Sequence, residues 1–139
     1  METEDLENEL LGYFRGLNAR AKALGWHRDS QWTRGINTDV AAIGKRRGYL
    51  VFASRCDLAV DGPEWLYDHH WRKVNAAGEL VRIPLAMEIE WGFGQKTIRS
   101  KVTEDYMKLV QSRSDLKVMV FASGTTDDML RDLLECRCL

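Results

Sequence analysis

The chain of 139 residues has 45% hydrophobic and 29% charged side chains, the size and composition of one ordinary globular domain. It has no run of the roughly 18 apolar residues that a membrane helix needs, and its 20 basic and 21 acidic side chains give no overall field that attracts nucleic acid. We therefore expect a single soluble domain over residues 1–139, in which any binding of nucleic acid is local.

The start of the chain and its cysteines indicate the compartment. Acidic residues such as Glu2 and Glu4 stand where a secretory signal has basic ones, which predicts a cytoplasmic protein. The cysteines are an odd number, Cys56, Cys136 and Cys138, and a domain of this size does not need disulfides. We expect free thiols, and the C-x-C pair has no second pair at zinc-site spacing.

The first predicted element is an amphipathic helix over residues 4–24 that ends at Gly25. Its apolar side chains recur at steps of three and four residues and so lie on one stripe. They are Leu6, Leu10, Tyr13, Phe14, Leu17, Ala21 and Leu24. Residues 26–37 show no clear period, and Asn37 or Thr38 is expected to cap a short second helix that closes near Gly44.

Three strands follow. Residues 48–54 are apolar and rich in β-branched and aromatic types, which predicts a buried strand, and residues 64–74 and 80–91 both alternate. Trp65, Tyr67, His69 and Trp71 are expected on one face of the second strand, with Leu66, Asp68, His70 and Arg72 on the other. In the third strand, Leu85, Met87, Ile89 and Trp91 lie opposite Ala86, Glu88 and Glu90.

The loop between the last two strands sets their register. A three-residue loop at 76–78 puts its glycine at the left-handed third position that such hairpins favour. This register pairs Asp68 with Ala86 and makes Asp68 and Glu88 diagonal neighbours, about 7–8 Å apart on one face. Glu90 follows on that face, so the sequence predicts a cluster of three carboxylates.

The rest of the chain predicts a helix, a strand and a helix. Apolar residues keep helical spacing over residues 98–113, residues 116–123 form an apolar strand, and Thr125 or Thr126 begins a last helix. Thr125 and Asp128 have the spacing of a capping box. The order of elements is therefore α, α, β, β, β, α, β, α.

The predicted carboxylate cluster favours metal chemistry. Carboxylates on one face repel one another unless a cation or shared protons relieve the repulsion. Mg²⁺ prefers oxygen ligands and binds one or two carboxylates together with waters and a substrate phosphate. Asp68 and Glu88 would present oxygens to one such ion, with the backbone carbonyl of Ile89 as a further ligand. The ion would activate water and screen a phosphodiester.

The residues that carry this chemistry resemble a family. Asp68 at the end of EWLYD and Glu88-Ile89-Glu90 within LAMEIEW are similar to the motif of the PD-(D/E)XK nuclease-like superfamily, and the resemblance covers most of residues 4–123. That superfamily has an α/β, restriction-endonuclease-like core that runs α-β-β-β-α-β, with a mixed central sheet flanked by helices. An Asp lies on its second strand and a Glu-x-Lys on its third.

The resemblance implies roles for individual residues. Asp68 and Glu88 would be metal ligands, and Glu90, which stands where the family usually has Lys, would be a ligand or general base. Some members are thought to take the lysine from the following helix, and Lys108 in DYMKLV is the candidate here. The first-helix acid of many members would be Glu7 or Glu9.

The function implied is that of a metal-dependent nuclease that hydrolyses phosphodiester bonds in nucleic acid, DNA in the first instance, with Mg²⁺ or Mn²⁺. A homodimer would let so small an enzyme cut both strands. The main alternative is a non-catalytic binding or regulatory module on the same fold with a decayed site. A hydrolase of a small phosphorylated molecule is a third option.

Several residues have simpler interpretations. Glu88 and Glu90 could lie on the solvated face of an antiparallel sheet. Asp68-His69-His70 spells the D-H-H of a phosphoesterase superfamily, but 139 residues cannot hold the larger two-domain body of that superfamily. From the alternation of the strand, His69 is expected in the core and His70 on the face of Asp68. Trp65, Trp71 and Trp91 are expected in the core rather than as base-stacking platforms. The sequence does not assign Trp26 and Trp32 to either role. The basic groups at residues 45–47, 72–73 and 96–101 are typical of a solvated face, with phosphate contact as the alternative.

Overall fold

A computed structural model of the chain describes residues 2–91 and 104–121. Within these ranges the helices are α1 (Glu2–Arg15), α2 (Leu17–Leu24) and α3 (Asp29–Arg46), and the strands are β1 (Leu50–Ala53), β2 (His69–Val74), β3 (Leu80–Glu90) and β4 (Ser114–Phe121). Residues 104–111 are helical and lie between β3 and β4 in the chain. The helix predicted from Thr125 and the cysteines at 136 and 138 lie outside the described residues, whereas Cys56 is a free thiol as expected.

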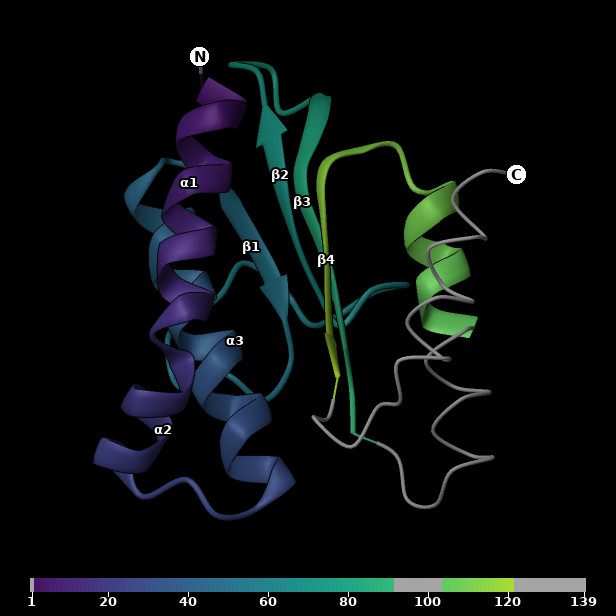
Figure 1. The fold of residues 1–139 in the computed structure, drawn as a ribbon. Helices are drawn as coiled ribbons and strands as arrows, with labels where there is room; N and C mark the ends of the chain where they lie inside the picture. The colour runs from purple at the N-terminus through teal and green to yellow at the C-terminus, as the bar shows by residue number, and fades with distance from the viewer. Residues whose placement is uncertain (1, 92–103, 122–139) are drawn as a thin grey trace.

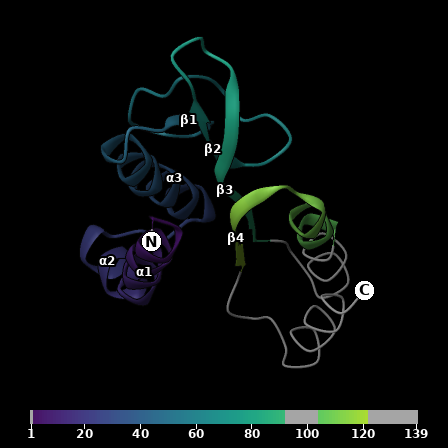
Figure 2. The same cartoon turned by 90° about the horizontal axis from the view of Figure 1, so that it is seen from above.

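The strands form one mixed sheet in the order β1-β2-β3-β4, in which β2 is antiparallel to both neighbours and β4 is parallel to β3. Figure 1 and Figure 2 show α1, α2 and α3 on one side of the sheet and the helical residues 104–111 on the other. The predicted α/β class with a mixed, helix-flanked sheet is therefore confirmed. No helix in the described part of the chain is long and apolar enough to cross a membrane.

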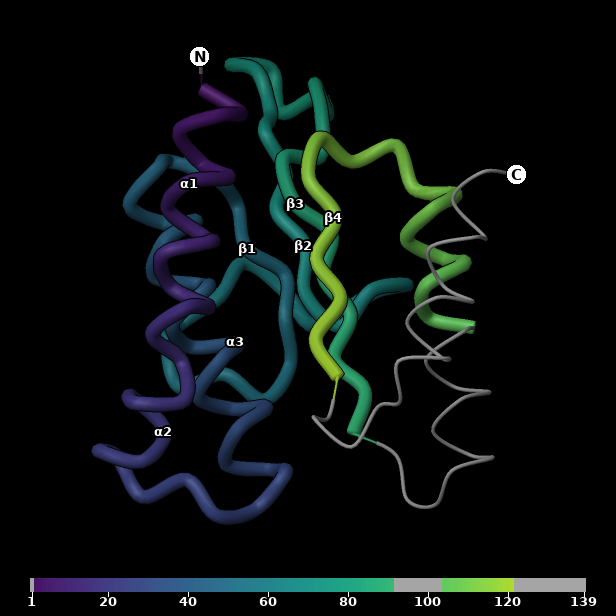
Figure 3. The backbone as a smooth tube through the Cα atoms, viewed as in Figure 1, coloured from purple at the N-terminus to yellow at the C-terminus, as the bar shows by residue number. Residues whose placement is uncertain are grey.

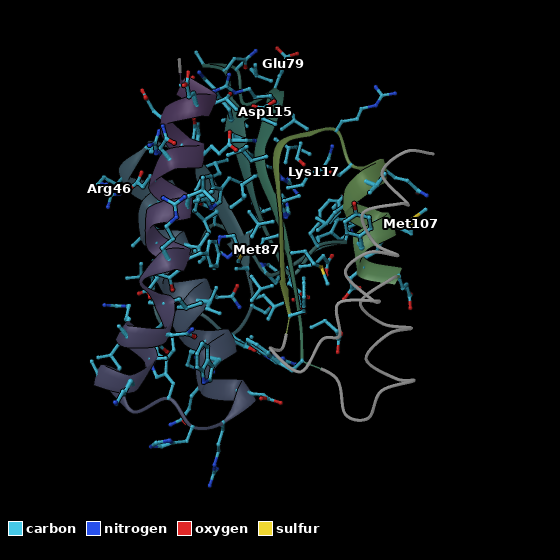
Figure 4. The ribbon with its side chains drawn as sticks, viewed as in Figure 1. Arg46, Glu79, Met87, Met107, Asp115 and Lys117 are labelled. Atoms are coloured by element: carbon cyan, nitrogen blue, oxygen red, sulfur yellow. The ribbon has the colours of Figure 1, made fainter. Side chains whose placement is uncertain are left out.

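The core lies between the sheet and helices α1 and α3. The register aligns Val51, Trp71, Leu85 and Leu116 in one row across the four strands, and the first three of these are fully buried. Figure 4 labels Met87 in the layer between the sheet and these helices, and Figure 3 shows the same packing of the chain as a tube. The core face predicted for β3 is the observed one, since Leu85, Met87 and Ile89 are all buried.

A buried polar network joins α3 to β2. His69 Nε2 accepts a hydrogen bond from Trp71 Nε1–H at 3.0 Å, so Nδ1 carries the proton and donates to Asn37 Oδ1 at 3.1 Å. Burial lowers the pKa of His69 to about 3, which keeps the ring neutral. His69 is thus a core residue, as the alternation predicted.

The helical prediction was partly wrong. Residues 4–24 do not form one helix, because the chain breaks at Gly16 between α1 and α2, although Gly25 ends α2 in the left-handed conformation with a φ of 73°. The second helix begins at Asp29 rather than at residue 37 or 38. Its start is fixed by Gln31, whose side-chain oxygen accepts the backbone N–H groups of His27 and Arg28.

The structure places the tryptophans that the sequence left unassigned and two that were expected in the core. Trp26 and Trp32 pack edge-to-face at 5.8 Å, and Trp32 packs in the same way on Trp91 at 6.1 Å. Trp91 also donates its indole N–H to Thr33 on α3 at 2.7 Å. Trp65 was predicted to be in the core, and this was wrong, because residues 64–68 precede β2 and leave its side chain 69% exposed.

A glycine in α3 makes room for the core indole. A Cβ at Gly44 would lie 2.6 Å from ring atoms of Trp71, whereas a Cβ at Gly12 of α1 would meet nothing within 4 Å. Alanine is a better helix former than glycine, so a substitution with free space should stabilise the protein. At Gly44 the clash with Trp71 outweighs this gain, so the change in the free energy of unfolding should have the opposite sign. We expect Gly12→Ala to raise the free energy of unfolding by about 0.5–1 kcal/mol and Gly44→Ala to lower it by about 1–3 kcal/mol. Urea denaturation measures both, and stabilisation by Gly44→Ala would contradict the packing.

Candidate functional site

The hairpin between β2 and β3 has the predicted turn but not the predicted register. Gly78 has a φ of 81°, and the N–H of Asn75 donates to the Glu79 carbonyl, so residues 76–78 form the loop. Two register shifts then follow, on either side of Lys73. As a result Ala86 pairs with His70 and not with Asp68.

The two shifts move Asp68 without changing its face. Each shift adds one residue on β3, and two single-residue shifts preserve the alternation of faces. His69 pairs with Met87, so Asp68, which comes just before β2, lies at the level of Glu88 instead of diagonal to it. Asp68 Oδ2 accepts the backbone N–H of Ile89 at 2.7 Å, which fastens this carboxylate to β3.

Glu88 is a buried carboxylate in the middle of the sheet. Its exposed fraction is 1%, so the interpretation as a solvated-face residue was wrong for Glu88. It lies on the face covered by the helical residues 104–111, from which Lys108 reaches it with Nζ 3.1 Å from Glu88 Oε1. The structure therefore brings Lys108 to Glu88, where the resemblance suggested that a lysine from the following helix would lie.

Lys108 is held by three groups at once. Its Nζ also lies 3.6 Å from Asp105 Oδ1 and donates to the backbone carbonyl of Leu66 at 3.2 Å. Burial opposes its charge, but the neighbouring carboxylates outweigh that effect and raise the pKa of Lys108. The lysine is therefore a fixed cation at this site.

One ammonium does not neutralise the cluster. Glu88 Oε1 is buried, and Lys108 Nζ at 3.1 Å is its cationic partner; this contact lowers the pKa of Glu88 but does not outweigh burial. Burial, followed by the charge of Asp68, raises the pKa of Glu88 to about 8. Without a further cation, much of the Glu88 population is protonated at neutral pH.

Two further acids join the cluster, and the sequence analysis missed both. Burial and the charge of Asp68 raise the pKa of Glu64, while burial raises the pKa of Asp105 against the attraction of Lys108. The helical spacing of Asp105 and Lys108 could have indicated Asp105. Glu90 is half-buried, follows Glu88 on its face, and its charge contributes to the raised pKa of Asp105.

The first-helix acids are elsewhere. Helix α1 covers the opposite face of the sheet, where Glu9 forms ion pairs with Arg46 and Arg47 at the end of α3. Glu7 lines a hollow between α1 and β4. Neither residue lies at the carboxylate cluster. Of the three basic residues at 45–47, Arg46 and Arg47 form ion pairs with Glu9.

His70 shares the face of Glu88 but has structural contacts. Its ring stacks on Phe52 with centroids 5.0 Å apart, and its Nε2 accepts a hydrogen bond from Arg72 Nε at 3.0 Å. Burial lowers the pKa of His70 to about 4. The ring is packed against Phe52 and its Nε2 is bonded to Arg72, contacts that suit a structural residue better than the metal ligand of a D-H-H motif.

The donor atoms at the cluster suit a hard cation in kind. Because a strand residue directs its N–H and C=O to the same side, the Ile89 carbonyl faces the edge at which Asp68 lies. Carboxylate and carbonyl oxygens, with more acids than the single Lys108 cation among them, fit Mg²⁺ chemistry. Within the described ranges, however, no three His, Cys, Asp or Glu side chains are already arranged to hold a metal ion.

Comparison with protein-family models, with curated proteins and with solved structures finds no match for this chain.

The raised pKa of Glu88 makes the stability of the protein depend on pH. The folded state keeps a proton that the unfolded chain releases from about pH 4.5, so stability falls as the pH rises through 4.5 towards 8. In EDTA at pH 8, Glu88→Gln should increase the free energy of unfolding by up to about 4 kcal/mol, and the gain should shrink towards pH 5. Urea denaturation at pH 5, 6.5 and 8 measures this.

Glu4→Gln, at an exposed position of α1, provides the control and should leave the pH profile of the wild type unchanged. Parallel profiles for the wild type and Glu88→Gln would show that Glu88 ionises normally in the folded protein.

Proposed function

We propose that the protein is a metal-dependent nuclease that hydrolyses phosphodiester bonds in nucleic acid, with Asp68, Glu88 and Glu90 as the residues that would hold Mg²⁺ or Mn²⁺. The observation that carries the proposal is the buried Glu88 carboxylate with the Lys108 ammonium 3.1 Å away, on the face that also bears Asp68. Burying a carboxylate beside other carboxylates is costly, and groups perturbed in this way are concentrated at functional sites.

The fold supports the same proposal. The described elements from α3 onward run α-β-β-β-α-β, and the cluster lies on the third strand and just before the second. This is the order that a restriction-endonuclease-like core would have. We propose that the chain has this core and that Lys108 takes the place of the lysine missing at position 90.

Each residue then has a part in the chemistry. When bound, the metal ion would supply an activated water and screening of the phosphate charge. Asp68, fixed by the N–H of Ile89, and Glu88 would offer oxygens from a rigid strand, and the proton on Glu88 would leave as the cation binds. The Lys108 ammonium can donate hydrogen bonds to a phosphate oxygen, where charge increases in the transition state.

One observation favours the alternative of a non-catalytic binding module on the same fold. Lys108 already neutralises part of the Glu88 charge, and the described acids are not arranged around a metal position. Calorimetric titration with Mg²⁺ and Mn²⁺ separates the two functions. A nuclease should bind the ion with release of a proton and lose the binding in Glu88→Gln, whereas a module with a decayed site should show no binding at the cluster.

The catalytic test measures cleavage of supercoiled plasmid and of circular single-stranded DNA with Mg²⁺ or Mn²⁺. Glu88→Ala and Lys108→Ala should each reduce the rate by about 100-fold or more, because each removes a charge from the site of transition-state stabilisation. Lys22→Ala on α2, on the other side of the sheet, should retain the full rate. Equal cleavage by the wild type and Glu88→Ala, or no cleavage by either, would contradict the proposal.

A further inference from the structure

Two large apolar side chains lie in water next to the carboxylate cluster. Trp65 is 69% exposed and Leu66 is 60% exposed, and they lie three and two residues before Asp68 in the chain. Exposure of this kind forgoes the stabilisation that burial would give. A tryptophan placed in this way needs an explanation other than packing.

The backbone at this point is also strained. The N–H of Tyr67 donates to the carbonyl of Trp65 at 2.8 Å, and Leu66 between them has a φ of 68°. This is a γ-turn with a positive φ, which is rare and strained for a residue with a bulky side chain. Such strain persists where the surroundings enforce it, and it is concentrated at functional sites.

The surroundings that enforce the turn are those of the site. The carbonyl of Leu66 accepts the hydrogen bond from Lys108 Nζ at 3.2 Å, and the same ammonium pairs with Glu88. On the other side of the turn, burial and the charge of Asp68 raise the pKa of Glu64. The exposed pair is therefore linked to the cluster through the Leu66 carbonyl and lies in the chain between two of its acids, Glu64 and Asp68.

We propose that Trp65 and Leu66 form a stacking surface for an unpaired nucleobase, and that the substrate of the site is single-stranded nucleic acid or an unpaired segment. This inference rests on the proposed function. A nucleotide combines a flat, largely apolar ring with an adjacent anion, which matches an exposed tryptophan next in the chain to Leu66, whose carbonyl binds the Lys108 ammonium. Stacking on an aromatic side chain accepts any base, and in a duplex the faces of the bases are already covered.

With a single-stranded substrate, the enzyme does not need to dimerise in order to complete the reaction. A duplex cutter needs a second active site for the second strand, whereas one site completes the reaction on a single strand. The near-neutral charge of the chain fits the same substrate, because binding would depend on a local stacking contact and not on a broad basic surface.

The first test measures binding in the Glu88→Gln background, in which no cleavage removes the ligand. Fluorescence anisotropy of a labelled 12-nucleotide oligothymidine should give tighter binding than a duplex of the same length. Trp65→Ala should weaken single-strand binding by about 10-fold or more, and Trp65→Phe should restore most of it. Leu24→Ala, at an exposed leucine of α2, should have no effect.

Three outcomes would overturn the inference: no binding of the single strand, equal binding after Trp65→Ala, or tighter binding of the duplex. Self-association that Trp65→Ala abolishes, without any effect on oligonucleotide binding, would assign the surface to a second copy of the chain and overturn it as well.

Cleavage assays separate this inference from the proposed function. If the wild type cleaves and Trp65→Ala cuts single-stranded DNA with an unchanged KM, the stacking surface is refuted while the nuclease stands. If the wild type cleaves nothing and single-strand binding still depends on Trp65, the stacking surface stands and the nuclease is refuted.

Discussion

The buried carboxylate of Glu88 is the constraint on which the candidate site depends. An apolar residue of similar size on β3 would pack there at no electrostatic cost, so the fold gains nothing from a charge at this position. The structure keeps it by bringing Lys108 from the helix that covers this face. Lys108 also donates to the carbonyl of Leu66, so one side chain links the helical residues 104–111 both to β3 and to the segment before β2.

The two faces of the sheet treat polar groups differently. On the face towards α3, the buried His69 has a hydrogen-bond partner on each ring nitrogen. These partners are Asn37 of α3 and Trp71 of β2. On the face of the cluster, Glu88 Oε1 has the Lys108 ammonium 3.1 Å away, and His70 Nδ1 is buried without a partner among the described residues. A buried carboxylate that has one cation and lies among other acids carries an electrostatic cost that the neutral His69 network does not.

Much of the site could be predicted because alternation fixes the face of each strand residue. It placed Glu88 opposite the core face of Met87 and Ile89, and the glycine turn at 76–78 was correct. The start of α3 was missed because Thr33 and Asn37 interrupt its apolar stripe. Both residues are buried, but their partners Trp91 and His69 are distant in the sequence, and no local pattern indicates such a pairing.

The misplacement of Asp68 has a different cause from that of Trp65. The register shifts on either side of Lys73 have no sequence signal, yet two shifts restore the face, so Asp68 still meets Glu88 and only its level was wrong. Residues 64–68 alternate like a strand but have no strand partner beyond the local contact of Trp65 with Tyr67, among the described residues. Alternation therefore predicts a face only where a neighbouring strand exists to define one, and at Trp65 the strained turn, held by Lys108, decides the outcome instead.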